Sequence, residues 1–391
     1  MKILITSIID LKKTAHNRLH QFIKYLSQNN EITVLSINDW WKVEQADVEL
    51  YSKGLEDVLQ GIDIKYFTNR KISPFLQELF SVATLDELLK KIDYKRFDVH
   101  LNYNTLVSGC FVTRKLKKID INTVYDVADD LTEMIRISPQ IPYILRPPGA
   151  FAGDIMFKKN IKDAARVTYA TQHLRDAYPA PPGRAEIIAN GTDIQLFTSR
   201  PVGQLRKKLG IGDGFLIGYV GTLREWVDFE PLFMALKQLN KKHPDIRLLI
   251  VGEEGGIGRV GELARSHKIL DRVTFTGTVP YAEVVDYISC MDMGVIPFGQ
   301  TRMAEEPCPL KLFEYMACEK PVISSRSMSV ANNKVLYAAN TEEYIDKITE
   351  LYENRELGKR LGKEGRQFVE QNHSWQKLAA DMEKVLLEVS R

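Results

Sequence analysis

The stretch from residue 246 to residue 276, IRLLIVGEEGGIGRVGELARSHKILDRVTFT, shows how this chain is built. Its two ends, Ile246–Val251 and Val273–Thr276, are short β-rich runs, and Gly258–Lys268 between them has a helical pattern. Strands that alternate with helices predict parallel sheets that are covered by helices on both faces. The stretch therefore predicts an α/β fold.

The same alternation extends through the rest of the chain. In the second half, further strands are expected at Phe215–Val220, Gly294–Pro297 and Pro321–Ser324, and further helices at Pro231–Lys242 and Pro309–Cys318. In the first half, strands are expected at Lys2–Ser7, Ile32–Ile37, Ile62–Phe67, Asp98–Asn102, Thr123–Val127 and Arg166–Ala170. The pattern predicts two doubly wound units of the Rossmann type.

The alternation is interrupted where proline, glycine and polar residues cluster, at Tyr178–Arg184 and at Asp193–Pro201. We place the domain boundary in this region, near residues 190–205. The predicted domains are residues 1–195 and 196–373. The last segment, residues 374–391, reads as an amphipathic helix with Trp375 and Leu378 on its apolar face. It is not needed to complete the second sheet, so we expect it to pack back toward the first domain.

Composition excludes several classes of protein. The 391 residues include 53 basic and 51 acidic side chains, a balance that argues against a nucleic-acid binder. The four cysteines lie far apart and form no C-x-x-C pair, as is usual in a reducing compartment. No apolar run has the length of a membrane span. We expect a cytoplasmic protein.

One glycine motif suggests a dinucleotide site, but its context argues against that reading. Residues Gly256 to Gly261 match G-x-G-x-x-G after a strand. In a dinucleotide fingerprint the first glycine itself makes the turn from strand to helix. Here Glu253 and Glu254 intervene and would place carboxylates where a pyrophosphate has to bind. A nicotinamide or flavin site at this place is therefore not expected.

A stronger signal is the segment EPCPLKLFE at residues 306–314, in which two glutamates are separated by seven residues. Pro309 suits the first turn of a helix, where its missing N–H costs nothing. The free amides of Leu310 and Lys311, the helix dipole and the Lys311 charge would then form an anion site. Glu306 and Glu314 could accept hydrogen bonds from sugar hydroxyls on either side of a bound diphosphate. An ordinary helix start with a solvated glutamate is the structural alternative.

Residues 306–314 and five segments that precede them resemble the retaining glycosyltransferases of family four, which have the GT-B fold. E-x7-E leading into K-P-V-I resembles their donor-site signature. Four other segments, which precede it in the chain, occur in the order that is usual for that family: residues 187–193 (IIANGTD), 215–221 (FLIGYVG), 248–252 (LLIVG) and 273–279 (VTFTGTV). The segment DMGVIPF at 292–298 resembles the strand before the E-x7-E loop. The resemblance implies two Rossmann-like domains facing a central cleft, with an acceptor domain first and a donor domain second.

The resemblance also implies which residues bind the nucleotide-sugar donor. Glu306, Arg224 and Lys311 are expected near the reacting centre, where the two cations would stabilise the diphosphate. The remaining donor-binding positions that it implies are Gly221, Thr222, Val251, Gly252, Thr276, Gly277, Val279, Pro309, Leu310 and Glu314. No metal and no cofactor are expected.

The chain departs from the family pattern in two places. Ile8-Ile9-Asp10 replaces the glycine pair that the family usually has after its first strand. Gly221 is followed by TLREWVD at residues 222–228, without the family's Lys-Gly pair. For this reason we assign the stabilisation of the diphosphate by positive charge to Arg224 and Lys311.

The acceptor side is marked by the segment YDVADD at residues 125–130, which resembles a branch of the family with a Y-D-x-x-D-D element. Asp126 is the residue that we expect nearest the acceptor hydroxyl. Asp129 and Asp130 are equally well explained as caps of the helix that begins near Leu131. Two further segments, Trp40-Trp41 and residues 146–153 (RPPGAFAG), are assigned to loops lining an acceptor cleft, and packing is the alternative for the paired tryptophans.

The predicted function is metal-independent transfer of a sugar, with retention of configuration, from a nucleotide-diphosphate sugar to a hydroxyl acceptor. The acceptor would be a saccharide or a lipid-linked molecule in glycan, polysaccharide or glycolipid assembly. The basic run at residues 114–118 is either a solvated helix end or a contact with anionic lipids at the inner membrane face. Two alternatives remain open: a nucleotide-sugar epimerase, and a catalytically silent subunit that binds nucleotide sugars.

Overall fold

The computed structural model describes the chain except residues 41–53, 139–140, 253, 302–304 and 306. It consists of two compact units. The first unit is Met1–Ala189 together with Gln376–Arg391, and the second is Asn190–Trp375. Among the helices of the described ranges, none has both the length and the apolar character needed to cross a membrane.

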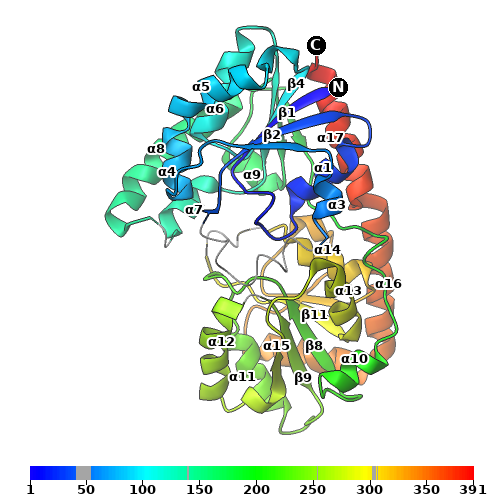
Figure 1. Ribbon diagram of the computed structural model, residues 1–391. Helices are drawn as coiled ribbons and strands as arrows, with labels where there is room; N and C mark the ends of the chain where they lie inside the picture. Colours follow the sequence, from blue (N-terminus) through cyan, green and yellow to red (C-terminus); the bar gives the residue numbers. More distant parts are fainter. Residues whose placement is uncertain (41–53, 139–140, 253, 302–304, 306) are drawn as a thin grey trace. The chain divides into compact units, whose positions relative to one another are not determined.

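The first unit contains a seven-stranded sheet with the order β3-β2-β1-β4-β5-β6-β7, in which every pair of neighbours is parallel (Figure 1). Its strands are β1 (Lys2–Ser7), β2 (Glu31–Ser36), β3 (Asp63–Tyr66), β4 (Val99–Tyr103), β5 (Thr123–Val127), β6 (Arg166–Tyr169) and β7 (Ala185–Ile187). The central strands β4 and β5 are buried along their whole length, as expected for a parallel sheet covered on both faces.

Helices connect and cover these strands. They are α1 (Arg18–Leu26), α3 (Glu56–Leu59), α4 (Pro74–Phe80), α5 (Val82–Lys91), α6 (Val107–Lys117), α7 (Leu131–Ile137), α8 (Arg146–Asp163) and α9 (Gln172–Ala177), with short 3-10 turns η2 (Tyr94–Arg96) and η3 (Tyr143–Leu145). Residues 146–153, which we assigned to a loop, are the first half of α8. That prediction was wrong because Pro147 and Pro148 fall in the first helical turn, where proline needs no N–H partner.

The C-terminal helix α17 (Trp375–Val389) belongs to the first unit from Gln376 onward. The Asn30 side-chain amide donates to the Glu383 carboxylate at 2.7 Å, and the Asn122 amide donates to the carbonyl of Val389 at 2.9 Å. The buried side chains of Leu378, Met382 and Leu386 recur at helical spacing. The apolar face read from the sequence is therefore the buried face of the helix.

The second unit has a six-stranded sheet with the order β10-β9-β8-β11-β12-β13, again with parallel neighbours. Its strands are β8 (Leu216–Val220), β9 (Arg247–Val251), β10 (Val273–Phe275), β11 (Met293–Ile296), β12 (Val322–Ser324) and β13 (Leu336–Tyr337). Its helices are α10 (Gly203–Lys208), α11 (Glu230–Leu239), α12 (Glu254–Ser266), α13 (Tyr281–Cys290), α14 (Leu310–Ala317), α15 (Thr341–Glu353) and α16 (Arg355–Asn372), with 3-10 turns at Leu270–Arg272 and Ser329–Ala331.

The strand order reverses direction beside the first strand of each unit. In the second unit β8 lies between β9 and β11, so the chain moves outward on one side and then returns to the other. Doubly wound sheets bind ligands beyond the carboxyl ends of their strands at such a switch point. The glycines Gly256, Gly258 and Gly261 lie within α12 and not in the turn after β9, so they do not form a dinucleotide fingerprint.

A buried ion pair ties the first unit together around Asp126, near the end of β5. Both Asp126 oxygens accept hydrogen bonds from the Arg18 guanidinium at 2.9 Å, and the Thr168 hydroxyl donates to Oδ1 at 2.7 Å. Arg18 also donates to the carbonyls of Ile188 and Ala189, at 2.7 and 2.9 Å. Because neither charged side chain is more than 3% exposed, water does not stabilise the two charges, and each is stabilised by the other.

We expect Asp126→Asn to lower the free energy of unfolding by about 3–5 kcal/mol, because it leaves a buried guanidinium without its countercharge. Urea unfolding of the purified chain would measure the change. Glu87→Gln is the control, because Glu87 pairs with Lys91 at 2.7 Å on an exposed helix face and should leave the unfolding midpoint unchanged. Equal stability of Asp126→Asn and the wild type would show that the pair does not support the fold.

Candidate functional site

Glycines at two neighbouring strand ends of the second unit allow the backbone segments after these strands to approach each other closely. The amide of Gly221, just after β8, donates to the carbonyl of Val251 at 2.8 Å, and the amide of Gly252 donates to the carbonyl of Gly277 at 3.1 Å. A Cβ atom at Gly252 would lie 2.1 Å from the Gly221 carbonyl oxygen. Only glycine fits at residue 252 without moving the backbone.

Lys311 is held against the same strand end by α14. Its ammonium lies 3.8 Å from the centre of the Tyr219 ring, a cation–π contact. A Cβ atom at Gly221 would lie 2.7 Å from Lys311 Nζ, and Gly221 has a φ of 124°, which side chains rarely adopt. Gly221 therefore provides both the space and the backbone conformation that bring the lysine charge to the end of β8.

The amino terminus of α14 is open toward an anion. Pro309 is the N-cap residue, and its carbonyl accepts a hydrogen bond from the amide of Leu312 at 3.1 Å. Within the described residues, the amides of Leu310 and Lys311 have no acceptor. Two free amides, the helix dipole and a lysine ammonium on one turn form the arrangement that binds phosphate groups.

Glu314 lies one turn after Lys311 on the same side of α14 and is buried. Burial raises the pKa of the Glu314 carboxyl to about 7, against the opposing effects of the Lys311 charge and a hydrogen bond with Tyr281. Burial also lowers the pKa of the Lys311 ammonium to about 7, and the Glu314 charge raises it. Two titratable groups with pKa values displaced toward neutrality in opposite directions are typical of a functional site.

The other predicted donor-binding residues lie at these strand ends, where mainly their backbone groups are available to a ligand. The Thr222 carbonyl accepts from the Tyr219 hydroxyl at 2.8 Å, and the Thr276 hydroxyl donates to the Gly277 carbonyl at 2.9 Å. Val251 is buried in the core, and Val279 packs partly buried against it. The side chains of Val251 and Val279 are therefore used for packing, so that a ligand would meet their backbone groups.

Arg224 is exposed on the loop after Gly221. Its carbonyl accepts a hydrogen bond from the Arg259 guanidinium at 3.2 Å. Glu306 lies outside the described residues, so its predicted role beside the transferred sugar stays a prediction.

Asn190 is a positioning residue that sequence reasoning missed. Its side-chain amide donates to the Cys308 carbonyl at 2.7 Å, and its backbone amide contacts Cys308 Sγ at 3.4 Å. On its other side, its carbonyl contacts His373 Nδ1 at 2.9 Å. Because Cys308 directly precedes Pro309, Asn190 fixes the approach of the chain to α14. The segment at 187–193 was noticed for its resemblance, but nothing local in it indicated this contact.

The acceptor-side candidates lie in the first unit. The contacts of Asp126 are those of a positioning residue, since Arg18 and Thr168 occupy its oxygens and its side chain is fully buried. Its role in turnover stays a prediction. Asp130 caps α7 by accepting from the amide of Glu133 at 3.0 Å, as the structural alternative for it proposed.

Asp10, which stands where the resembled family has glycine, ties down the loop after β1. Its carboxylate accepts from the amides of Lys12 and Asp39, at 3.1 and 3.0 Å, and from the Tyr66 hydroxyl at 3.2 Å. The Lys13 ammonium pairs with it at 3.0 Å. This loop is thus held by a buried carboxylate instead of being freed by glycine.

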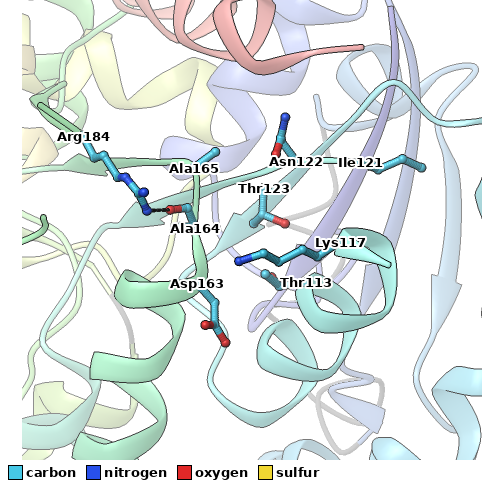
Figure 2. Close-up of a pocket in the computed structure, with 9 residues that line it drawn as sticks. All are labelled: Thr113, Lys117, Ile121, Asn122, Thr123, Asp163, Ala164, Ala165 and Arg184. Carbon is cyan, nitrogen blue, oxygen red and sulfur yellow. Dashed lines mark hydrogen bonds between the residues drawn. The ribbon is translucent and has the colours of Figure 1, made fainter. Parts of the chain in front are cut away.

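A polar cavity of about 220 Å³ lies at the other edge of the first sheet (Figure 2). It opens at the amino ends of β5 and β6, where Lys117, Arg184 and Asp163 contribute charges of both signs. The Asp163 carboxylate is already paired with Lys159 at 3.0 Å. The cavity is therefore separate from the carboxyl-end edge, where Asp126 lies. Among the described residues, no cluster of three or more histidine, cysteine or carboxylate side chains could hold a metal ion.

Comparison with curated proteins relates the chain to enzymes that transfer sugars. It is 29% identical over 168 residues to TuaH of Bacillus subtilis, which is named for teichuronic acid biosynthesis; the match covers 42% of this chain and 40% of TuaH. It is 26% identical over 231 residues to a GDP-mannose-dependent phosphatidylinositol monomannoside mannosyltransferase of Mycobacterium tuberculosis, covering 55% of this chain and 60% of the relative. The chain thus spans less than two thirds of the length of these relatives.

Solved structures share the whole fold at low sequence identity. Sucrose-phosphate synthase from Thermosynechococcus elongatus superposes with a TM-score of 0.77 at 17% identity, covering 99% of this chain and 98% of that one. HepE of Anabaena, in complex with UDP-glucose, gives a TM-score of 0.74 at 18% identity, covering 99% of this chain and all of that one. The model of the family "Glycosyl transferases group 1" matches residues 202–368. These residues form a group 1 glycosyl transferase domain, and the chain that contains them has the two-domain GT-B fold.

Proposed function

We propose that this chain is a glycosyltransferase that moves a sugar from a nucleotide-diphosphate sugar to a hydroxyl acceptor. The observation that carries the proposal is the anion site at the start of α14, where Lys311 and the free amides of Leu310 and Lys311 meet the glycine end of β8. This site lies within the matched domain, residues 202–368. A diphosphate supplies the charge that such a site is built to bind.

In the proposed reaction, the bond between the anomeric carbon and the β-phosphate oxygen breaks, and the acceptor oxygen forms the new bond on the same face. The developing negative charge on the leaving diphosphate is stabilised by the α14 amides, by Lys311 and by Arg224. The acceptor hydroxyl passes its proton to the leaving phosphate oxygen. Neither a metal ion nor a protein nucleophile takes part.

The two glutamates divide the donor between them. Glu314, buried on α14, is proposed to accept hydrogen bonds from the nucleotide ribose, and Glu306 from the transferred sugar. For the donor we propose a nucleoside diphosphate sugar such as the UDP-glucose bound by HepE or the GDP-mannose named for the mycobacterial relative. A thermal-shift screen of UDP, GDP, ADP and dTDP identifies the base: a ligand at about 100 times its Kd stabilises the fold by about 2.7 kcal/mol.

For the acceptor we propose a saccharide or a lipid-linked hydroxyl compound, as the phosphatidylinositol monomannoside in the name of the mycobacterial relative suggests. A lipid-linked acceptor would require the protein to reach a membrane surface, and we propose peripheral contact with the inner membrane face.

Stereochemistry tests the reaction class. The product should keep the anomeric configuration of the donor, because attack and departure occur on one face, and turnover should survive EDTA because no metal takes part. NMR of the product formed from an α-linked donor measures the first, and an activity assay with the chelator measures the second. A β-linked product would contradict the proposed mechanism.

Replacement of Glu314 tests the placement of the donor. Glu314→Gln should weaken the nucleoside diphosphate by about 1.5–3 kcal/mol, the scale of a hydrogen bond to a charged group. Glu306→Gln should instead lower turnover while the free nucleotide still binds. Calorimetry with the nucleotide separates the two variants, and Glu319→Gln, on an exposed residue beyond the end of α14, is the matched control. Unchanged affinity in Glu314→Gln would show that this helix does not hold the ribose.

Protonation of Lys311 gives a further test. With its pKa lowered to about 7, the lysine is largely neutral at pH 8, and a bound diphosphate would raise its pKa. Binding at pH 8 should therefore take up protons, and affinity should fall as the pH rises from 6 to 9. Calorimetry in buffers of different ionisation enthalpy counts the protons. Glu314, whose pKa is also displaced to about 7, titrates in the same window, so Glu314→Gln is measured in parallel.

Lys311→Arg keeps the positive charge but does not titrate near neutrality. It should reduce the proton uptake while binding persists. Proton uptake equal to that of the wild type in Lys311→Arg would exclude Lys311 as the group that responds to the diphosphate.

A further inference from the structure

The first unit exposes an apolar surface on η3 and the first half of α8. Tyr143 is 83% exposed, Ile144 79% and Phe151 69%, far more than is usual for such side chains. We call this surface the apolar tip. It consists of the exposed residues Pro142, Tyr143, Ile144, Leu145, Pro147, Pro148, Phe151, Ala152 and Ile155.

The tip is held in place by close packing of three helices. A Cβ atom at Gly149 would lie 3.4 Å from a methyl group of Ile135 on α7 and 3.9 Å from the Phe75 ring on α4. At Gly153 the distance to Ile135 would be 3.0 Å. The small residues of α8 thus face the protein, and its larger apolar residues are left facing solvent. Leu76, Leu79 and Phe80 of α4 and Met134 and Ile137 of α7 are exposed as well.

Charges around the tip favour an anionic partner. Each acidic side chain of α7 and α8 is paired with a basic one: Glu133 with Arg136, Asp154 with Lys158 and Asp163 with Lys159. The surplus charges on these helices are Arg146 and Lys162, both positive; Lys162 lies in the last turn of α8, away from the tip, so Arg146 is the surplus charge at the tip. Arg146 lies within the tip, where its guanidinium donates to the Ile141 carbonyl at 2.9 Å and lies 5.7 Å from the centre of the Tyr143 ring.

The size of the tip argues against a second copy of the chain as its partner. A stable protein interface uses roughly 20–30 residues on each side. The tip supplies nine residues, and the five exposed apolar side chains named on α4 and α7 bring the number to fourteen, still below that range. Exposed aromatic and aliphatic side chains beside an arginine are instead the composition of segments that lie in the interface of a bilayer.

We infer that the apolar tip docks onto an anionic lipid bilayer. The chain topology indicates what this docking would do. That part of the inference rests on the proposed function. Helix α8 ends just before the amino end of β6, so its beginning lies at the opposite edge, where β5 ends after Asp126. A lipid-linked acceptor held in the membrane would then be near the edge of the sheet that carries the acceptor-side candidates.

The basic run at residues 114–118, from which a lipid contact was first predicted, is placed less well. It ends α6 at the amino-end edge of the sheet, where its charges suit the helix dipole. Lys115 forms an ion pair with Asp86 and lies 5.1 Å from the Tyr94 ring centre. The apolar tip is the surface that combines exposed apolar side chains with unbalanced positive charge.

Vesicle flotation of the full chain tests the inference. The protein should float with phosphatidylcholine vesicles that contain about 30% phosphatidylglycerol, and less with phosphatidylcholine alone. Removing three of the side chains in Tyr143→Ser/Ile144→Ser/Phe151→Ser should reduce the partition coefficient at least about tenfold, because their apolar surface no longer enters the interface. Arg146→Gln should reduce binding to the anionic vesicles about fivefold.

Two matched variants complete the experiment. Leu387→Ser removes an exposed leucine of α17 outside the tip, and Arg114→Gln/Lys118→Gln removes charge from the end of α6; both should float like the wild type. Thermal melting verifies that the triple variant is folded. A wild type that does not float, or a folded triple variant that floats equally well, would overturn the inference.

Two further measurements distinguish lipid docking from self-association and from the proposed sugar transfer. Sedimentation that shows a dimer in the wild type and a monomer in the triple variant would make the tip a self-association surface and overturn lipid docking. Glu314→Gln should float normally, because the donor site takes no part in docking. If no sugar transfer is found while flotation holds, the proposed function fails and the docking surface stands.

Discussion

The close approach of backbone at the end of β8 is the constraint on which the candidate site depends. Gly252 must lack a side chain because its Cβ position lies 2.1 Å from the Gly221 backbone oxygen, and Gly221 has a φ of 124°, which side chains rarely adopt. With these two positions open, α14 brings an ammonium and two free amides to one strand end. Without them the cation and the helix terminus could not meet the sheet at this place, and no anion site would form.

Parallel strands explain why features far apart in sequence serve one edge in each unit. In the second unit, the residues after β8, β9 and β10 lie together because all three strands run in the same direction. In the first unit, the same polarity places the end of β5, the capped start of α7 and the beginning of α8 at one edge. Asp126, Asp130 and the apolar tip share that edge, whereas the polar cavity of Figure 2 lies at the other.

Much of the fold could be predicted because the apolar runs are strong. The strands predicted at Lys2–Ser7 and Thr123–Val127 have the observed bounds. The edge strands β7 and β13 were missed because three and two partly exposed residues carry little signal. The start of α8 was predicted as a loop, since its prolines and glycines are typical of turns unless they occupy the first turn and the packed face of a helix.

The candidate site was predictable only in part, for a different reason. Glycines and a helix start are visible locally, so Gly221, Gly252 and Lys311 could be proposed from the residues and the resemblance. Partners far apart in sequence were not visible. Arg18 meets Asp126 across 108 positions, and Asn190 meets Cys308 across 118. Only the folded chain shows that Asp126 is buried and paired with Arg18.

The partial burial of Lys311 also has a chemical consequence. An amine whose pKa lies at about 7 is partly unprotonated at neutral pH, whereas an ordinary exposed lysine is almost wholly an ammonium ion. The free amine is a nucleophile, and it lies at the mouth of an anion site. Lys311 is therefore suited to covalent capture by an aldehyde-bearing phosphate compound, which the site would first bind by charge and whose carbonyl would then condense with the amine to an imine, releasing water.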